Sequence, residues 1–328
     1  MNKLRTSLFF IVSAILLFLL FFADILWGSV RIPIEEVFLQ DSIYANIINN
    51  FRLPKAITAV VVGMSVAVSG LLMQTLFRNP LAGPYVLGVS SGASFGVAIY
   101  ILVGGFLPVV FLQSGWGLII SAVVGAIFVL ILVLSVSFRI HDSITLLIVG
   151  MMFGQIAGSL VSVLQNISNP DSLKLFVVWT FGDLSAVTWS YMKAMIPIVL
   201  VGLVIVFLIQ KPLNTLLLGE NYAKSLGVSV LKVRLLIIVA TALLAGGVTA
   251  FTGPIAFVGV AVPHLVRLLW KTSDHKITIP ACLLVGANLL LVCDLLSQTT
   301  LNGYILPINA ISSLVGAPII IWIIMRNR

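Results

Sequence analysis

The chain has 328 residues, 60% of them hydrophobic and only 9% charged, and its formal net charge is +8. Soluble domains average about 45–50% apolar and about 25% charged residues, so this composition excludes an ordinary soluble protein, whose surface needs more charge. Apolar runs of about 20 residues, the length of a bilayer crossing, recur from end to end. We therefore predict an all-α, polytopic membrane protein in which residues 1–328 form a single transmembrane domain.

Hydropathy predicts about ten membrane spans. The first follows Lys3 and Arg5 and has the charge pattern of a signal peptide, but no cleavage site between small residues is evident and further spans follow, which favours a retained span. The eighth is short for a straight crossing and contains Pro263, so we expect a kink or a preceding half-helix there. The predicted ranges are 7–27, 54–77, 86–104, 117–137, 143–165, 191–210, 233–250, 256–270, 279–296 and 307–325.

The basic residues are distributed unevenly between the predicted loops. If the N-terminus lies in the cytoplasm and the spans alternate, 13 of the 18 Lys and Arg residues fall on the cytoplasmic side and 5 on the other. The positive-inside rule then places both termini in the cytoplasm. The net charge follows from this topology, and no basic patch interleaved with aromatic residues points to nucleic acid.

Glycine spacing and chain breaks indicate how the spans pack. Gly150, Gly154 and Gly158 recur on one face of the fifth span, as do Gly92 and Gly96 in the third. Such stripes predict close helix crossings, within the chain or across a subunit interface, although glycine is also simply common in membrane helices. Irregular backbone at membrane depth survives only beside protein or a water-filled cavity, which favours a transporter over a static anchor. The breaks are Gly83-Pro84, Gly253-Pro254, Pro263 and Gly316-Ala317-Pro318.

The chemistry-bearing residues do not form an enzyme-like or metal-binding pattern. No Gly-x-x-x-x-Gly-Lys-Ser/Thr motif for nucleotide phosphates is present, and the histidines lack metal-site spacing. Cys282 and Cys293 lie eleven positions apart in apolar stretches and are interpreted as packing residues. Asp294, and more weakly Asp24, are the carboxylates near span ends, fewer than an ion-coupled carrier would need. We therefore predict no catalytic residue, bound metal or cofactor, and energy coupling through a partner. The histidines are His141, His264 and His275.

Residues 211–230, here called the coupling loop, connect the sixth and seventh spans. Gly219 and Gly227 are placed to end two short helices. Leu218, Tyr222 and Leu226 follow an i, i+4, i+8 pattern and predict an apolar face. On a cytoplasmic loop such a face fits a groove of another protein, or alternatively the membrane surface.

At this point the motifs resemble a known family: the permease subunits of ABC importers for iron siderophores, haem and vitamin B12. The resemblance covers essentially the whole chain, in the same order. The motifs that carry it are Arg52-Leu53-Pro54-Lys55, Arg78-Asn79-Pro80-Leu81-Ala82, Ala223-x-x-Leu226-Gly227-Val228, Gly253-Pro254-Ile255-Ala256-Phe257-Val258-Gly259 with Pro263-His264-x-x-Arg267, and Gly316-Ala317-Pro318.

The resemblance implies an assembly in the bacterial inner membrane. Two copies of the ten-span chain would form a homodimer around a central path. Two cytoplasmic ATP-binding subunits would carry ATP and Mg²⁺, and an extracytoplasmic substrate-binding protein would deliver the cargo. The chain itself would be a non-enzymatic transport subunit without a cofactor. A ferric siderophore is the preferred cargo because it is the commonest in the family, with haem and vitamin B12 as alternatives and a secondary carrier that needs no ATPase as the rival class.

The resemblance also assigns roles to particular residues. Arg52 and Lys55 match basic residues that pair with carboxylates of the binding protein. Gln298 stands where a further basic residue is common, so that docking contact is either absent or moved, for example to Lys174. The residues expected to contact the ATPase are Leu218, Gly219, Glu220, Tyr222, Ala223, Leu226 and Gly227.

A bulky, mostly neutral cargo suits a path lined by small and apolar residues with a few amides. Candidate path residues are Gln74, Ser91, Gln155 and Asn288. Hydrogen bonding between helices is an equally good interpretation of each.

Overall fold

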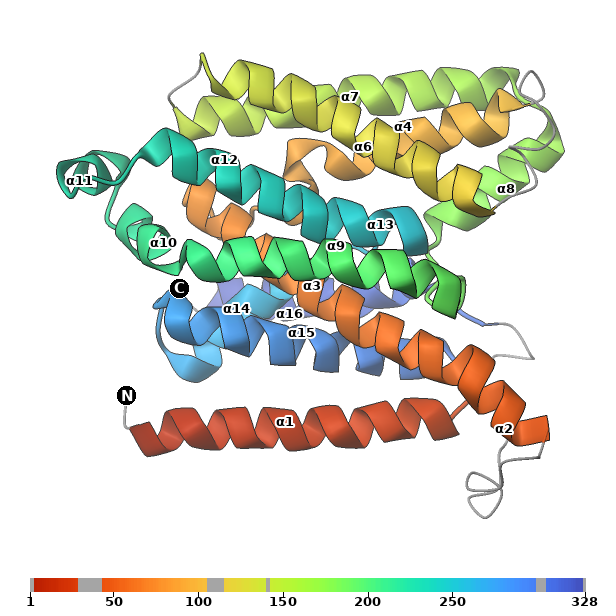
Figure 1. The fold of residues 1–328 in the computed structure, drawn as a ribbon, viewed down its shortest axis with the longest axis horizontal. Coiled ribbons are helices and arrows are strands. Elements are labelled where there is room, and N and C mark those ends of the chain that lie inside the picture. The colour runs from red at the N-terminus through yellow and green to blue at the C-terminus, as the bar shows by residue number, and fades with distance from the viewer. Residues whose placement is uncertain (1–2, 29–42, 105–114, 140–141, 299–304, 327–328) are drawn as a thin grey trace. The chain divides into compact units, whose positions relative to one another are not determined.

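The computed structural model describes residues 3–28, 43–104, 115–139, 142–298 and 305–326 (Figure 1). Contacts divide the chain into two compact units. Unit 1 takes in residues 1–71, 183–197 and 255–328, and unit 2 takes in residues 72–182 and 198–254. The expectation that residues 1–328 form one transmembrane permease domain stays a prediction.

The predicted spans correspond to observed helices. Within the described residues, 7 helices are long and apolar enough to cross a membrane. Shorter apolar helices at Val89–Leu102, Val258–Trp270 and Ile308–Ile323 match the remaining predicted spans. Every regular element in the part of the chain that the structure describes is helical. The prediction of an all-α, polytopic membrane protein is therefore confirmed.

Unit 1 is built on the long helices α1 and α15. Helix α15 packs against α1, α14 and α16, and the buried Trp270 side chain contacts the rings of Phe9 and Phe10 at centroid distances of 5.4 and 5.2 Å. Its elements are α1 (Lys3–Leu26), α2 (Ile43–Ile47), the π-helical turn η2 (Ile48–Arg52), the first part of α3 (Leu53–Phe77), the start of α9 (Trp189–Leu208), α14 (Val258–Trp270), α15 (His275–Ser297) and α16 (Ile308–Arg326).

Helices α3 and α15 cross with their backbones in contact. A Cβ atom added at Gly63 would overlap the carbonyl group of Gly286, and one added at Gly286 would overlap the carbonyl group of Gly63. Each glycine therefore makes room for the other helix. Close backbone approach of this kind provides the packing that lipid-exposed apolar surface cannot provide.

Unit 2 places α4 against both α6 and α7 (Figure 1). Its elements are the last turns of α3, the 3₁₀ turn η3 (Pro84–Leu87), α4 (Val89–Leu102), α6 (Gly115–Ser137), α7 (Ser143–Ile167), α8 (Pro170–Thr180), the rest of α9, α10 (Gln210–Leu217), α11 (Glu220–Ser225), α12 (Val230–Thr241), the π-helical turn η5 (Ala242–Gly246) and α13 (Gly247–Thr252). Helix α8 was not predicted, because eleven residues of mixed polarity give little hydropathy signal.

The predicted glycine stripes serve crossings within unit 2, with one exception. A Cβ at Gly92 would lie 2.6 Å from the carbonyl oxygen of Gly125, and one at Gly96 would overlap Ser121. A Cβ at Gly150 would lie 3.1 Å from the carbonyl oxygen of Val86, whereas one at Gly154 would make only ordinary van der Waals contact with Gly88, at 3.4 Å. Gly158, however, meets no described atom within 4 Å, so its place in the stripe serves no crossing in the described chain.

The predicted breaks fall at helix ends or inside short helices. Gly253 has φ +73° and lies between α13 and α14, where an added Cβ would come 2.5 Å from the carbonyl oxygen of Trp179. Helix α14 has 13 residues and contains Pro263, which agrees with the short eighth span predicted above. Pro318 likewise lies inside α16.

Candidate functional site

The coupling loop contains two short helices, as the glycines predict. After α11, the amide of Val228 donates to the carbonyl of Ala223 and the amide of Gly227 donates to the carbonyl of Lys224. Together with φ +79° at Gly227, these bonds form a Schellman motif, which ends a helix with a left-handed residue. At the corner between α10 and α11, Gly219 has φ +121° and ψ 147°, a conformation that is essentially restricted to glycine.

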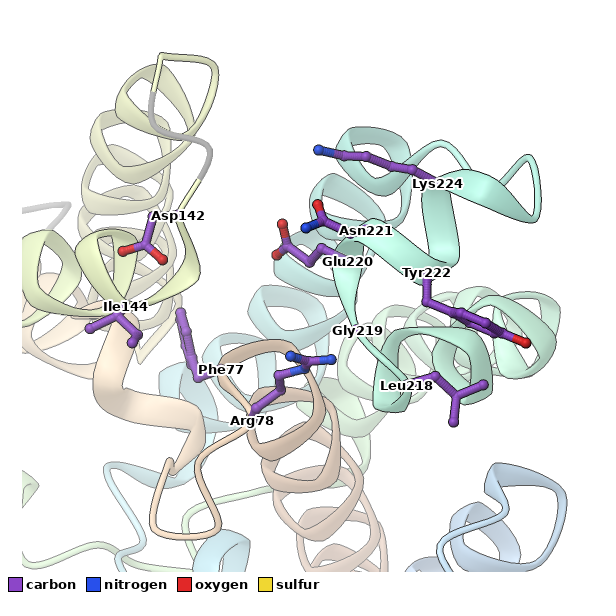
Figure 2. Close-up of a pocket in the computed structure, with 10 residues that line it drawn as sticks. All are labelled: Phe77, Arg78, Asp142, Ile144, Leu218, Gly219, Glu220, Asn221, Tyr222 and Lys224. Carbon is purple, nitrogen blue, oxygen red and sulfur yellow. The ribbon is translucent and has the colours of Figure 1, made fainter.

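Three apolar side chains of the loop are exposed to solvent. Leu218 is 65% exposed, Tyr222 52% and Leu226 56%. Figure 2 shows the side chains of Leu218 and Tyr222 on the side of the loop that faces away from Asp142. These three residues do not share one continuous helix: Gly219 separates Leu218 from α11, and Leu226 follows the last turn of α11.

The other residues predicted to contact the ATPase lie differently. Gly219 and Ala223 are buried, and the Glu220 carboxylate forms an ion pair of 3.0 Å with Arg234 on α12. Gly227 is exposed at the end of α11. An apolar face and an inward-pointing carboxylate thus lie on the same short loop.

A hollow of about 820 Å³ lies beside the α10–α11 corner (Figure 2). Arg78, directly after α3, projects toward the corner, and its guanidinium donates to the carbonyl of Leu216 from Nε at 3.4 Å and from Nη2 at 3.3 Å. The lining residues are Phe77, Arg78, Asp142, Ile144, Leu218, Gly219, Glu220, Asn221, Tyr222 and Lys224.

Asp142 marks the opposite wall of this hollow. Its carboxylate caps the N-terminus of α7 by accepting from the Thr145 hydroxyl at 2.7 Å and from the Thr145 amide at 2.8 Å. Both bonds lower the pKa of Asp142 below its usual value, and the bond from the Thr145 hydroxyl has the larger effect. Sequence reasoning did not single out Asp142, although an Asp before an apolar run is a helix-start signal.

In unit 1, polar side chains join the ends of α1, α3 and α15. This polar cluster consists of Asp24, Arg52, Lys55, Asp294 and Gln298. Lys55 Nζ lies 2.8 Å from Asp294 Oδ2, and Arg52 Nη1 donates to the carbonyls of Ile25 and Leu26 at 2.7 and 2.8 Å. The Lys55 side chain is 17% exposed and Arg52 is 8% exposed. Both predicted docking cations are therefore engaged within unit 1, and their docking role stays a prediction.

Gln298 fills a donor position within the polar cluster. Its Nε2 donates to Asp24 Oδ1 at 2.9 Å and to Asp294 Oδ2 at 3.0 Å. An amide thus bridges two carboxylates at the position where a basic residue is common in the family that the chain resembles. The remaining oxygen of Asp24 is buried without a hydrogen-bond partner among the described residues.

The four candidate path residues are divided between the two units, and their role in the path stays a prediction. Gln74 is buried, Ser91 is partly exposed and Gln155 is exposed on α7, all in unit 2. Asn288 belongs to unit 1, where its side-chain amide donates to the carbonyl of Ser13 on α1 at 3.0 Å. For Asn288 this geometry favours the interhelical interpretation.

Sequence reasoning counted Arg234 only as a topological charge, yet it is the buried partner of Glu220. The available signal was a charged residue at the start of an apolar run, since ionisable groups within membrane spans are commonly paired. Among the described residues, no group of three or more His, Cys, Asp and Glu side chains is placed to hold a metal ion. His141 lies outside the described residues.

These helices define a polytopic α-helical membrane protein. The sequence matches the profile of the FecCD transport family over residues 15–326, and the chain therefore belongs to this family.

Known relatives agree with this assignment. The chain is 36% identical to the vitamin B12 import system permease protein BtuC of Klebsiella pneumoniae, over 84% of this chain and 82% of BtuC. It is 36% identical to the hemin transport system permease protein HmuU of Yersinia pestis, over 85% of this chain and 83% of HmuU. A solved structure, described as an inward-facing conformation of a candidate metal-chelate type ABC transporter, superposes with a TM-score of 0.87 at 30% identity and covers 97% of this chain and 98% of its own. The chain is an ABC importer permease.

Proposed function

We propose that this chain translocates a bulky metal chelate across the bacterial inner membrane in an ATP-driven importer, with a ferric siderophore as the first cargo to test. The observation that carries the proposal is the family match over nearly the whole chain. Two relatives are named for cargo that is itself a metal chelate, vitamin B12 and hemin, so these compounds are the alternatives.

The working assembly would contain two copies of this chain around a central path. Two ATP-binding subunits would attach on the cytoplasmic side, where both termini also lie, and ATP with Mg²⁺ would bind there. A substrate-binding protein would deliver the cargo from outside. The uneven distribution of basic residues supports this orientation.

The coupling loop would seat its exposed apolar side chains in a groove of the ATPase subunit. Leu218, Tyr222 and Leu226 are each more than half exposed, and an apolar face laid into a groove is a recurring mode of helix recognition. Closure of the ATPase pair would then move α10 and α11 together. The buried Ala223 would support this face from within.

The polar cluster would form part of the surface on which the binding protein docks. Lys55 retains 17% side-chain exposure while paired with Asp294, so a carboxylate of the binding protein could share its charge. Exposed ion pairs contribute only about 0–1 kcal/mol each. Such contacts would steer and register the partner more than hold it.

Reconstitution tests the proposal. The purified chain, its ATPase subunits and its binding protein would be placed in liposomes, and uptake of a radiolabelled ferric siderophore, hemin and cyanocobalamin would be compared with and without ATP on the ATPase side. We expect ATP-dependent uptake of one of the three. Gradient-driven uptake by the chain without the ATPase would instead establish a secondary carrier and overturn the proposal.

A further inference from the structure

The α10–α11 corner is held on both sides of Gly219 by two arginines from outside the loop, one directly after α3 and one on α12. On the α11 side, Arg234 of α12 pairs with Glu220 at 3.0 Å, and the Arg234 side chain is only 3% exposed. On the α10 side, Arg78 donates to the carbonyl of Leu216. Residues 216 and 220 flank the one position of the corner whose backbone needs glycine.

The Arg234–Glu220 pair holds the start of α11 in place against α12. Removing a guanidinium from water costs several kcal/mol unless a partner compensates it. The Arg234 side chain is buried, whereas the Glu220 side chain is 27% exposed. The ion pair therefore lies where the buried interior borders the surface. Glu220 is the first residue of α11, so this bond fixes the start of that helix to α12.

Arg78 adopts a conformation that its side-chain type does not favour. Its φ of +47° lies in the left-handed region, which is strained for a residue other than glycine. The strain places the guanidinium near the C-terminus of α10, where a cation is favourable next to the unpaired carbonyls. The Arg78 guanidinium also lies close to Gly219, where an added Cβ would come 2.8 Å from Nη2.

We propose that Arg78 and Arg234 are positioning residues that clamp the coupling loop to the ends of α3 and α12, and that Glu220 acts within the chain rather than on the ATPase. The inference rests on the proposed function only in taking the exposed face of this loop as the contact for the ATPase. With both anchors in place, a displacement of Leu218 and Tyr222 is passed to two membrane helices at once. Without one anchor, the loop turns about Gly219 and the displacement is lost.

The first test needs no partner. A nitroxide attached through Tyr222→Cys reports motion of α11 by electron paramagnetic resonance in the purified chain. Cys282 and Cys293 are buried and should not take the label. We expect Glu220→Gln and Arg78→Asn to narrow the spectrum, which means faster motion, whereas Lys232→Gln, which neutralises an exposed charge on α12, should leave it unchanged. Asn is chosen at residue 78 because it tolerates left-handed backbone. Unchanged spectra in both variants would overturn the clamp.

The second test uses the reconstituted importer. Glu220→Gln should keep co-purification of the ATPase within about twofold, while cargo imported per ATP hydrolysed falls at least about tenfold. Loss of ATPase binding instead would show that Glu220 contacts the partner, and unchanged import per ATP would also refute the clamp. If Glu220→Gln does not fold by size-exclusion chromatography, Arg78→Asn gives the same readouts. Absence of ATP-driven uptake in the wild type would count against the proposed function, while the nitroxide spectra would still decide the clamp.

Discussion

The coupling loop and the polar cluster each centre on an ion pair, but the surroundings of the two pairs differ. In the cluster, Lys55 and Asp294 are 17% and 3% exposed, and Gln298 and Arg52 beside them are also buried. In the loop, the pair between Glu220 and Arg234 lies next to apolar side chains that are more than half exposed. An ion pair thus lies in a mostly buried setting in one region and beside exposed apolar side chains in the other.

The largest effect is expected in the polar cluster. Asp294→Ala removes the counter-charge of Lys55 and one acceptor of Gln298, and breaking a buried pair from one side costs about 3–5 kcal/mol. Thermal unfolding of the purified chain in detergent should therefore shift strongly downward. Asp171→Ala, at an exposed position near the start of α8, is the control. Equal melting of the two variants would mean that the cluster is not a closed structural unit.

The second prediction compares a glycine that packs against another helix with a glycine that has no described neighbour. Gly96→Ala would force a methyl group into the Ser121 backbone, and overpacking costs about 1–3 kcal/mol. Gly158→Ala meets no described atom within 4 Å, and alanine is the better helix former by about 1 kcal/mol. Chemical denaturation should thus show opposite signs for the two substitutions. Destabilisation by Gly158→Ala would reveal a contact with a second copy or another partner.

Because the apolar side chains of the coupling loop are exposed, replacing them should weaken binding of the ATPase without destabilising the fold. Replacing Leu218 and Tyr222 together by Ser should weaken ATPase association at least about tenfold, since a few exposed apolar anchors commonly dominate an interface. Melting temperature should stay unchanged. Asn221→Ala is the matched control, because Asn221 is exposed on the same helix but points toward the hollow (Figure 2). Equal association of wild type and double variant would remove the loop from the interface.

The smallest effect concerns the wall of the hollow. Hydrogen bonds from Thr145 lower the pKa of Asp142 in the folded chain below its usual 3.8. The stabilisation is therefore present above that pH and is lost as the pH falls through the lowered value. Asparagine caps helices as well as aspartate does, so Asp142→Asn should reduce the fall in melting temperature between pH 5 and pH 3. The two proteins should melt alike at pH 7; identical pH profiles would exclude this contribution.

Hydropathy predicted the spans because an apolar run is a local property of the chain. The two short helices of the coupling loop were predictable for the same reason, since Gly219 and Gly227 act on their immediate neighbours. The partners of Glu220 and Lys55 were not predictable, because Arg234 and Asp294 reach them through tertiary packing. The same holds for Gln298. The sequence showed that a positive charge is missing at this position, but it did not predict that the Gln298 amide bridges two carboxylates.

The crossing of α3 and α15 has an evolutionary consequence. Gly63 and Gly286 each occupy the space that a side chain on the other would need. Neither position offers a viable first substitution, because any methyl group at one site strikes main chain that no rotamer change can move. Neither glycine can therefore be replaced first. A descendant sequence could accept a side chain here only after substitutions elsewhere had moved the two helices farther apart.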